Sequence, residues 1–319
     1  MATIPPSVLI VRLDAVGDAL TTVPLVAALR RHGMRIGAVL RPVNADVFSS
    51  RGVDRVHVAR NGNIVEEIRA ENYDYALIPT EKPLAYQIAK AAKIPRRVGF
   101  ENGWGKPLKS LWIRRMCTET IFRTAGLDPA APHECEVVFK LVRHIIPDPE
   151  PPRDPAVLRP FVLEGEPIPD ERIAIQITDK WERLGAGTGE IVEIVDRIAQ
   201  AHTVRLIGAS HERAYCERIA EAAKLPVETF DELNGWKNSI AAARALVAPD
   251  SGAVHVAGMI GTRVVACFAA RDFALQTARW SPWAAAHRII KMEGESWPIV
   301  AADALESLLT GNRSAVYRG

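Results

Sequence analysis

Residues 8–18 read VLIVRLDAVGD, an apolar and partly β-branched run that ends in a polar turn. The residues that follow, 18–32, have the apolar spacing of an amphipathic helix. The same alternation continues through the first half of the chain. Strands are predicted at residues 8–13, 35–40, 53–59, 75–79 and 97–100, and helices at residues 18–32, 64–71 and 83–93. Short connections between alternating strands and helices favour right-handed βαβ units and a parallel sheet.

The second half repeats this organisation after a proline-rich stretch. Strands are predicted at residues 172–177, 203–207, 245–248, 263–268 and 287–291, and helices at residues 190–201, 212–224, 239–243 and 253–260. Residues 147–169 contain eight prolines and are predicted to form an extended connector. The sequence therefore predicts an α/β protein with two Rossmann-like, doubly wound domains, residues 1–150 and 151–319. Because ligands of such sheets bind at the carboxyl ends of the strands, we expect the active site in the cleft between the domains.

Composition points to an ordinary globular chain. It has 319 residues, of which 48% are hydrophobic and 24% charged, and its net charge is +2. No apolar run approaches the ~20 residues of a membrane-spanning helix, and the N-terminus lacks the layout of a signal peptide. We therefore expect a cytoplasmic protein. The four cysteines form no CxxC pair, so they are expected to be reduced, buried thiols rather than a disulfide framework or a zinc site.

Residues 93–123 hold a local surplus of positive charge. They contain eight Lys or Arg and two Glu, together with several aromatic side chains. One interpretation is a solvated helix face. The other is a platform for an anionic partner such as a phosphorylated glycolipid or an acidic membrane surface. No zinc-finger spacing, RNP-type motif or basic tail accompanies the segment, so we expect no nucleic acid partner.

Asp18 is the first candidate for chemistry, at the junction between the first strand and its helix. One interpretation makes it a helix N-cap, with Gly17 allowing a tight turn. The other makes it a carboxylate on a rigid junction that accepts a proton. Asp14 supplies a second carboxylate nearby and is equally consistent with a loop residue.

Residues 247–255 predict a strand end, an acidic turn and the start of a helix. Free backbone N–H groups at such a helix start form an anion site, to which the Ser251 hydroxyl and His255 would add. Asp250 would orient the turn or accept hydrogen bonds from its amides. The alternative is an ordinary helix with an Asp/Ser cap.

A third strand end, at residues 175–181, offers Lys180 as a phosphate ligand, although a lone surface lysine is the plainer interpretation. After the next strand, Glu212 is placed either to hold a ribose hydroxyl or to act as a first-turn helix acid. The glycines of residues 185–189 superficially resemble a dinucleotide fingerprint, but the sixth position is Glu190. The chain contains no Asp-x-Asp, phosphate loop, GxSxG, HExxH or catalytic cysteine motif, so a mechanism without metal or cofactor is expected.

Together these segments resemble the ADP-heptose:lipopolysaccharide heptosyltransferase family, glycosyltransferase family nine. Residues 8–13 with Gly17-Asp18 and Pro24 are similar to the family's opening strand, turn and helix. Residues 250–255 are similar to its nucleotide-binding signature. Further matches, in the same order as in the family, are Gly261-Thr262, residues 266–268, residues 95–100, residues 279–283 and His287-Arg288. The resemblance therefore runs over most of the chain.

The resemblance implies a GT-B architecture, with acceptor on the N-terminal side and sugar nucleotide on the C-terminal side. It also implies inverting, metal-independent transfer of heptose or a related sugar from an ADP-sugar to an anionic glycan or glycolipid, such as lipopolysaccharide core. Asp18 becomes the general base. The donor site comprises Thr178, Lys180, Glu212, Asp250, Ser251, Gly252 and His255. The acceptor candidates are Lys106, Lys109, Arg114 and Arg115, which could also rest at the inner membrane face.

Two other classes stay open at this point. One is an NAD-dependent oxidoreductase that uses the glycines of residues 185–189. The other is a non-catalytic sugar-nucleotide-binding protein of the same fold. A different acceptor, such as a protein or a secondary metabolite, and a different nucleotide sugar are also open.

Overall fold

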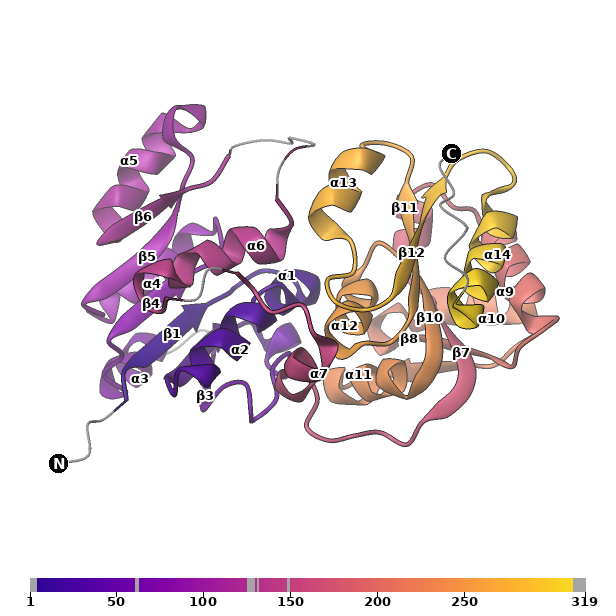
Figure 1. The fold of residues 1–319 in the computed structure, drawn as a ribbon, viewed down its shortest axis with the longest axis horizontal. Helices are drawn as coiled ribbons and strands as arrows, with labels where there is room; N and C mark the ends of the chain where they lie inside the picture. The colour runs from indigo at the N-terminus through magenta and orange to yellow at the C-terminus, as the bar shows by residue number, and fades with distance from the viewer. Residues whose placement is uncertain (1–4, 61–62, 125–129, 131, 148–149, 312–319) are drawn as a thin grey trace. The chain divides into compact units, whose positions relative to one another are not determined.

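The chain divides into two compact units in the computed structural model, which describes residues 5–60, 63–124, 130, 132–147 and 150–311. Unit 1 comprises Met1–Arg153 and Pro160–Glu164, and unit 2 comprises Asp154–Arg159 and Gly165–Gly319. Each unit contains its own six-stranded parallel sheet with helices between the strands (Figure 1). The location of the active site between the two domains stays a prediction.

Unit 1 has the strand order β3-β2-β1-β4-β5-β6. Its strands are β1 (Ser7–Val11), β2 (Arg35–Leu40), β3 (Arg55–Val58), β4 (Tyr75–Ile78), β5 (Arg96–Glu101) and β6 (Glu119–Phe122). This is the order of a Rossmann sheet, and it reverses direction between β1 and β4. The loops that follow β1 and β4 therefore meet at the switch point, where such sheets bind ligands.

Unit 2 repeats the same topology, in the order β12-β11-β10-β7-β8-β9. Its strands are β7 (Asp170–Gln176), β8 (Val204–Ala209), β9 (Val227–Phe230), β10 (Ala243–Pro249), β11 (Val264–Ala269) and β12 (His287–Met292). The switch point lies between β7 and β10, so the segments after residues 176 and 249 end at the same edge.

Helices cover both faces of each sheet. Those of unit 1 are α1 (Val16–Leu20), α2 (Val23–Arg31), α3 (Ile64–Ala70), α4 (Pro83–Ala91), α5 (Pro107–Met116) and α6 (Glu134–Phe139). Those of unit 2 are α7 (Pro155–Leu158), α8 (Lys180–Arg183), α9 (Thr188–Ala199), α10 (Arg213–Ala223), α11 (Leu233–Ala242), α12 (Gly252–Ile260), α13 (Phe273–Trp280) and α14 (Trp297–Thr310). Short 3-10 helices add η1 (Pro42–Asn44), η2 (Gly103–Gly105), η3 (Lys140–His144), η4 (Arg159–Phe161) and η5 (Ser210–Glu212). None of the helices described is both long and apolar enough to cross a membrane.

Alternate strand residues build the two sides of each core. In unit 1, Leu9 and Val11 of β1 pack toward the helices α3 and α4. In unit 2, Ile173 and Ile175 of β7 pack on the side of α9, α10 and α14, which also lie together in Figure 1. Successive strand side chains point to opposite faces, so both faces of these central strands are buried. Rigid, buried strands thus carry the loops that hold the candidate site residues.

Three local predictions differ from the structure. The single helix predicted at residues 18–32 is two helices, α1 and α2, because the hydroxyls of Thr21 and Thr22 bond back to the carbonyls of Asp18 and Ala19. The connector predicted at residues 147–169 contains the short helix α7, whose start is capped by Asp154. The short helix predicted at residues 239–243 is the end of the longer α11, and Ala243 already begins β10.

Candidate functional site

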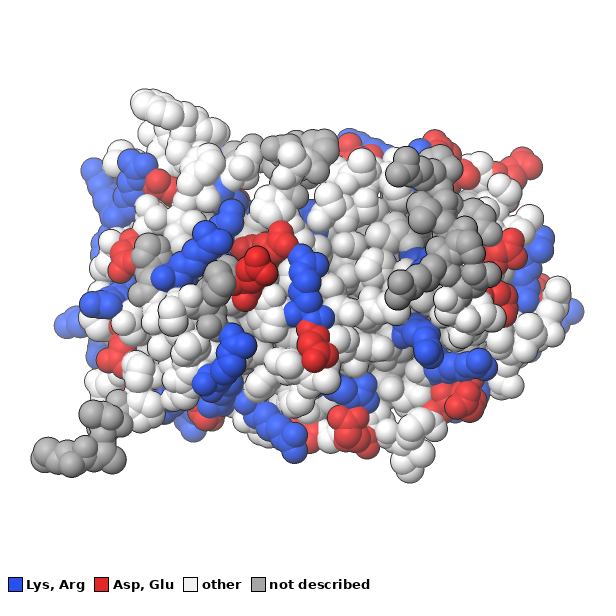
Figure 2. All heavy atoms as spheres, viewed as in Figure 1, with Lys and Arg blue, Asp and Glu red and all other residues white. Residues whose placement is uncertain are grey.

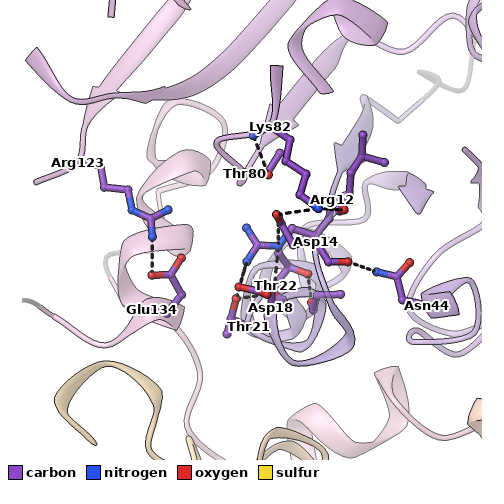
Figure 3. A network of polar contacts seen from close by, with 12 residues as sticks. Arg12, Asp14, Asp18, Thr21, Thr22, Asn44, Thr80, Lys82, Arg123 and Glu134 are labelled. Carbon is purple, nitrogen blue, oxygen red and sulfur yellow. Dashed lines mark hydrogen bonds and ion pairs between the residues drawn. The ribbon is translucent and has the colours of Figure 1, made fainter. Parts of the chain in front are cut away.

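A buried arginine organises the switch point of unit 1. Arg12 follows β1 directly, and its side chain is 2% exposed. Figure 3 shows its guanidinium between Asp14 on one side and Asp18 and Thr21 on the other. Nε of Arg12 lies 3.4 Å from Oδ2 of Asp14 and donates to the main-chain carbonyl of Asp18 at 3.1 Å. The second nitrogen, Nη2, lies 3.5 Å from Oδ1 of Asp18 and 3.5 Å from Oγ1 of Thr21.

Asp14 is held by cations on two sides. Besides Arg12, the Lys82 ammonium lies 3.7 Å from its Oδ1 and donates to the carbonyl of Leu13 at 2.6 Å. Asn44 donates to the Asp14 carbonyl at 3.1 Å (Figure 3). These contacts join the loops after β1, β2 and β4 at one edge. Asp14 therefore serves as a structural carboxylate in this loop cluster.

Asp18 keeps a more accessible carboxylate, with 36% of its side chain exposed. The prediction that it is an N-cap is wrong, because α1 begins at Val16 with Ala15 as the N-cap and Asp18 lies in the first turn. Burial raises the pKa of Asp18 from its usual value, the Arg12 guanidinium lowers it, and Asp14 and Glu134 raise it. A carboxylate with a raised pKa on a fixed helix start has the properties of a general base.

The sequence predicted no role for Arg12, and it gave no indication of Lys82. The position of Arg12, a charged residue directly after a buried strand, is the sequence feature that could have indicated its role. Lys82 lies on the β4–α4 loop and reaches Asp14 because β4 pairs with β1 in the sheet. The predicted Rossmann-like topology is consistent with β4 beside β1, but no sequence pattern indicates that the Lys82 ammonium reaches the Asp14 carboxylate.

At the switch point of unit 2, helix α12 presents its N-terminus after β10. Ser251 is the N-cap in extended conformation, and Gly252 is the first helical residue. Oγ of Ser251 makes no cap hydrogen bond, and no described group is its partner. First-turn N–H groups with a free hydroxyl beside them are suited to binding an anion.

Lys180 lies at the same edge, as the first residue of α8. Its ammonium is 3.8 Å from Oδ2 of Asp250, and a third of the Lys180 side chain is exposed. Burial raises the pKa of Asp250, and the Lys180 ammonium acts in the opposite direction. The structure thus brings Lys180, Asp250, Ser251 and Gly252 together, as the strand ends predicted.

His255 belongs to the interior of unit 2 rather than to its surface. It is 5% exposed, and its ring meets that of Trp280 edge-to-face at 5.8 Å. Burial lowers the pKa of His255 to about 4, and Lys180 acts in the same direction. The imidazole is therefore neutral near pH 7, so positive charge at this edge comes from Lys180 instead.

Glu212 and Thr178 form a second polar cluster at this edge. Oγ1 of Thr178 donates to Oε1 of Glu212 at 3.0 Å, and the backbone N–H of Asp179 donates to the same oxygen at 3.3 Å. Burial, followed by the neighbouring Asp179 carboxyl, raises the pKa of Glu212. Glu212 follows β8, the position from which an acid contacts a ribose in Rossmann sheets.

The glycines of residues 185–189 do not lie where a dinucleotide fingerprint needs them. In that motif the glycine turn follows the first strand directly, whereas here α8 intervenes between β7 and the glycines. The Glu190 carboxylate accepts from the backbone N–H of Gly187 at 2.7 Å and from the indole N–H of Trp297 at 2.6 Å. A carboxylate already occupies the start of α9, which disfavours a diphosphate there.

The predicted acceptor residues are partly engaged by acids. Lys106 and Lys109 lie 3.1 and 2.6 Å from Oε2 of Glu81, and Arg114 pairs with Glu101. Burial tends to raise the pKa of Glu81, but hydrogen bonds from both lysines outweigh it and hold the pKa at about 2. Figure 2 shows positive and negative side chains interleaved on the face it displays. The segment is thus a mixed-charge surface with a positive excess.

The comparisons agree with the family named from the sequence. Residues 192–306 match the family model described as glycosyltransferase family 9 (heptosyltransferase). No curated protein sequence matches the chain significantly.

Solved structures match over nearly the whole chain. A glycosyltransferase family 9 protein from Veillonella parvula has a TM-score of 0.75 at 14% identity, covering 96% of this chain and 97% of its own. ADP-heptose LPS heptosyltransferase II from Escherichia coli has a TM-score of 0.73 at 17% identity, covering 96% and 99%. Heptosyltransferase WaaC from E. coli, solved with ADP, has a TM-score of 0.70 at 19% identity, with the same coverage. At these identities the likeness establishes the fold.

The two parallel six-stranded sheets with interleaved helices match these GT-B structures, which confirms the predicted fold class. Fold and family match together support a glycosyltransferase. Residues 192–306 match the model of the same family that the sequence motifs resemble, glycosyltransferase family 9 (heptosyltransferase).

Proposed function

We propose that this protein transfers heptose, or a related sugar, from an ADP-sugar to an anionic glycan or glycolipid such as lipopolysaccharide core. Transfer proceeds with inversion and without a metal. One observation carries the proposal. The segment that matches the family 9 model presents the N-terminus of α12, where the Ser251 hydroxyl has no partner among the described residues. The Lys180 ammonium lies near Asp250 at the same edge of the sheet.

Unit 2 holds the donor in this proposal. The diphosphate accepts hydrogen bonds from the first amides of α12 and from Ser251, and Lys180 neutralises its charge. Glu212, supported by Thr178, holds the ribose hydroxyls. Asp250 orients Lys180 through their ion pair. As negative charge develops on the departing diphosphate, these fixed donors stabilise it, and each typically contributes ~10²–10³ in rate.

Unit 1 supplies the base. Inverting transfer needs a group that removes the proton of the acceptor hydroxyl as the new glycosidic bond forms. Asp18 takes this role, since Asp14 is committed to Arg12 and Lys82. Arg12 fixes the Asp18 carboxylate through contacts to both its main chain and its side chain. General-base assistance of this kind is usually worth ~10²–10⁴ in rate.

An anionic acceptor fits the positive excess of α5, where Arg115 is exposed and Lys106 and Lys109 share one acid, Glu81. We place the protein in the cytoplasm, with a peripheral contact to the inner membrane face. The oxidoreductase alternative is disfavoured by Glu190, which occupies the start of α9.

Calorimetric titration with ADP, UDP, GDP and NAD, with and without Mg²⁺, tests the donor assignment. We expect ADP to bind more tightly than UDP or GDP, with an affinity that does not depend on Mg²⁺. Tight binding of NAD, or no binding of any nucleotide, would reject the proposal. Transfer from ADP-heptose by the wild-type protein then separates an enzyme from a non-catalytic binder of the same nucleotide.

A further inference from the structure

An exposed apolar cluster lies on unit 1, away from the buried cores. We call it the α5 patch, and it comprises Trp104, Leu108, Leu111 and Phe122. These side chains are 95%, 84%, 51% and 60% exposed, respectively. Single exposed apolar residues are ordinary, but a cluster of large ones usually marks a contact surface.

The members of the α5 patch are neighbours in the fold. Leu108 and Leu111 lie one turn apart on α5, so they share a helix face. A Cβ on Gly103 would lie 3.2 Å from the Phe122 ring, which brings β6 next to the residue preceding Trp104. Ser110 ties the segment together by donating to the Gly103 carbonyl at 3.2 Å. The patch therefore combines η2, α5 and the edge strand β6.

The opposite face of α5 is firmly packed. Ile113, five residues after Leu108, is fully buried in the core of unit 1. Trp112 flanks the exposed stripe, and its ring meets that of Tyr86 edge-to-face at 5.7 Å. The helix thus has one apolar face inside unit 1 and a second apolar stripe outside it. Turning the exposed residues inward would expose the packed ones, so the exposure of the α5 patch is fixed by the fold.

Basic side chains border the α5 patch. They are Lys90, Lys106, Lys109, Arg114 and Arg115, against the two acids Glu81 and Glu101. Lys90 belongs to this border because it donates to the Arg115 carbonyl at 3.0 Å, at the end of α5. The border keeps a positive excess after its ion pairs are formed. Exposed Trp, Leu and Phe with a Lys/Arg border are the composition of a surface that lies in a membrane interface.

We propose that the α5 patch docks unit 1 onto an anionic lipid bilayer. Trp104, Leu108, Leu111 and Phe122 enter the boundary between headgroups and acyl chains, and the basic border contacts lipid phosphates. The ion pairs of Lys106 and Lys109 with Glu81 connect the patch to the β4–α4 loop, which also carries Lys82 at the Asp14 site. Docking therefore holds the acceptor edge of unit 1 close to lipid headgroups.

This inference deepens the proposed membrane contact and rests on the proposed function only for the choice of membrane. Sedimentation with vesicles of phosphatidylcholine alone, or of an equal mixture with phosphatidylglycerol, tests it without any sugar transfer. We expect the full chain to bind the mixed vesicles and to bind the neutral ones at least about fivefold more weakly, because each basic residue near an anionic surface contributes about that factor. Absence of binding to the mixed vesicles would overturn the proposal and leave the donor assignment standing.

Matched variants locate the contact. Trp104→Ser combined with Leu108→Ser should weaken binding to mixed vesicles at least about tenfold, since both side chains leave the interface. Ile168→Ser, at an 87% exposed position of unit 2, should leave it unchanged. Arg115→Gln should weaken binding, and Arg271→Gln, in unit 2, should not. Equal binding by the Trp104/Leu108 variant and the wild type would overturn the proposal.

Two further readouts distinguish bilayer docking from self-association of the chain. Tryptophan emission should shift to shorter wavelength on mixed vesicles, and Trp104→Phe should remove much of that shift while vesicle binding persists. Sedimentation velocity without lipid tests whether the patch instead joins two copies of the chain. A dimer that Leu108→Ser dissociates would assign the surface to self-association and contradict bilayer docking.

Discussion

The buried Arg12 side chain donates to the main-chain carbonyl of Asp18 at 3.1 Å, while its second nitrogen lies 3.5 Å from the Asp18 carboxylate. One guanidinium therefore fixes both the backbone and the side chain of the proposed base. It also contacts Asp14, so two carboxylates share one cation. This shared cation makes Arg12 a positioning residue whose loss would affect stability and the pKa of Asp18 together.

Replacement of Arg12 by Gln should destabilise unit 1. Breaking a fully buried ion pair costs about 3–5 kcal/mol. Both carboxylates here reach solvent, so we expect about 2 kcal/mol, measured by urea unfolding at pH 7. Arg183→Gln, which removes an exposed ion pair to Asp179, should cost less than about 1 kcal/mol. Equal midpoints for wild type and Arg12→Gln would contradict the structural role of Arg12.

Relative to the wild type, Asp18→Asn should be more stable at neutral pH, and this advantage should shrink in acid. A raised folded-state pKa means that the folded state binds the Asp18 proton more tightly than the unfolded state. Its stabilising contribution is thus fully present below the ordinary Asp pKa of 3.8 and is lost as pH rises through the raised value. The melting temperature of Asp18→Asn minus that of the wild type should fall as the pH is lowered from 7 toward the ordinary Asp pKa of 3.8. A difference in melting temperature that grows toward acid would contradict a raised pKa of Asp18 in the folded state.

Lys180→Ala should weaken ADP binding roughly tenfold to a hundredfold, the usual worth of a hydrogen bond to a charged group. Adenosine, which lacks phosphates, should bind the variant and the wild type equally. Lys291→Ala is the matched control, because Lys291 lies on β12, away from the β7–β10 switch point, and pairs with Glu293. Calorimetric titration measures the affinities of the wild type, Lys180→Ala and Lys291→Ala for ADP and for adenosine. A parallel loss of adenosine affinity would indicate a disturbed fold rather than a lost phosphate ligand.

Two glycines should respond oppositely to alanine. A Cβ on Gly258, inside α12, would lie 2.8 Å from the backbone nitrogen of Trp283 and 3.1 Å from Cα of Pro282. Since backbone must move, Gly258→Ala should cost about 1–3 kcal/mol. Gly189, in the first turn of α9, has no described atom within 4 Å of such a Cβ, so Gly189→Ala should stabilise by about 0.5–1 kcal/mol. Thermal unfolding measures the stability of both variants, with Gly189→Ala as the comparison at an open position. Stabilisation by Gly258→Ala would contradict the close packing of α12 against Pro282 and Trp283.

Local patterns predicted much of the fold. The strands β1, β2 and β4 have continuous apolar runs because both of their faces are buried, and that signal is independent of the rest of the chain. The edge strands β6 and β9 were missed, since their half-exposed four-residue segments have no apolar run. Helix α5 was missed for a different reason. Its exposed stripe contains Leu108 and Leu111, so it lacks the single apolar face that periodicity detects.

The candidate site was predictable where it depends on strand ends. Asp18, Lys180 and Ser251 all follow buried strands, and parallel sheets bring such positions to one edge. Burial and charge state were not predictable, because they depend on residues from distant segments. His255 is neutral through packing against Trp280, and Asp14 is held by Lys82, which lies far from it in sequence.

The release of ADP from ADP-heptose, in the presence of a lipopolysaccharide acceptor that lacks its heptose, tests the central claim most directly. The wild type should turn over, and Asp18→Asn should lose ~10²–10⁴ in kcat while its affinity for ADP stays within about twofold of wild type. Ser50→Ala, far from Asp18 in sequence and exposed on unit 1, serves as the control with unchanged turnover. Turnover by Asp18→Asn at the wild-type rate would contradict the account.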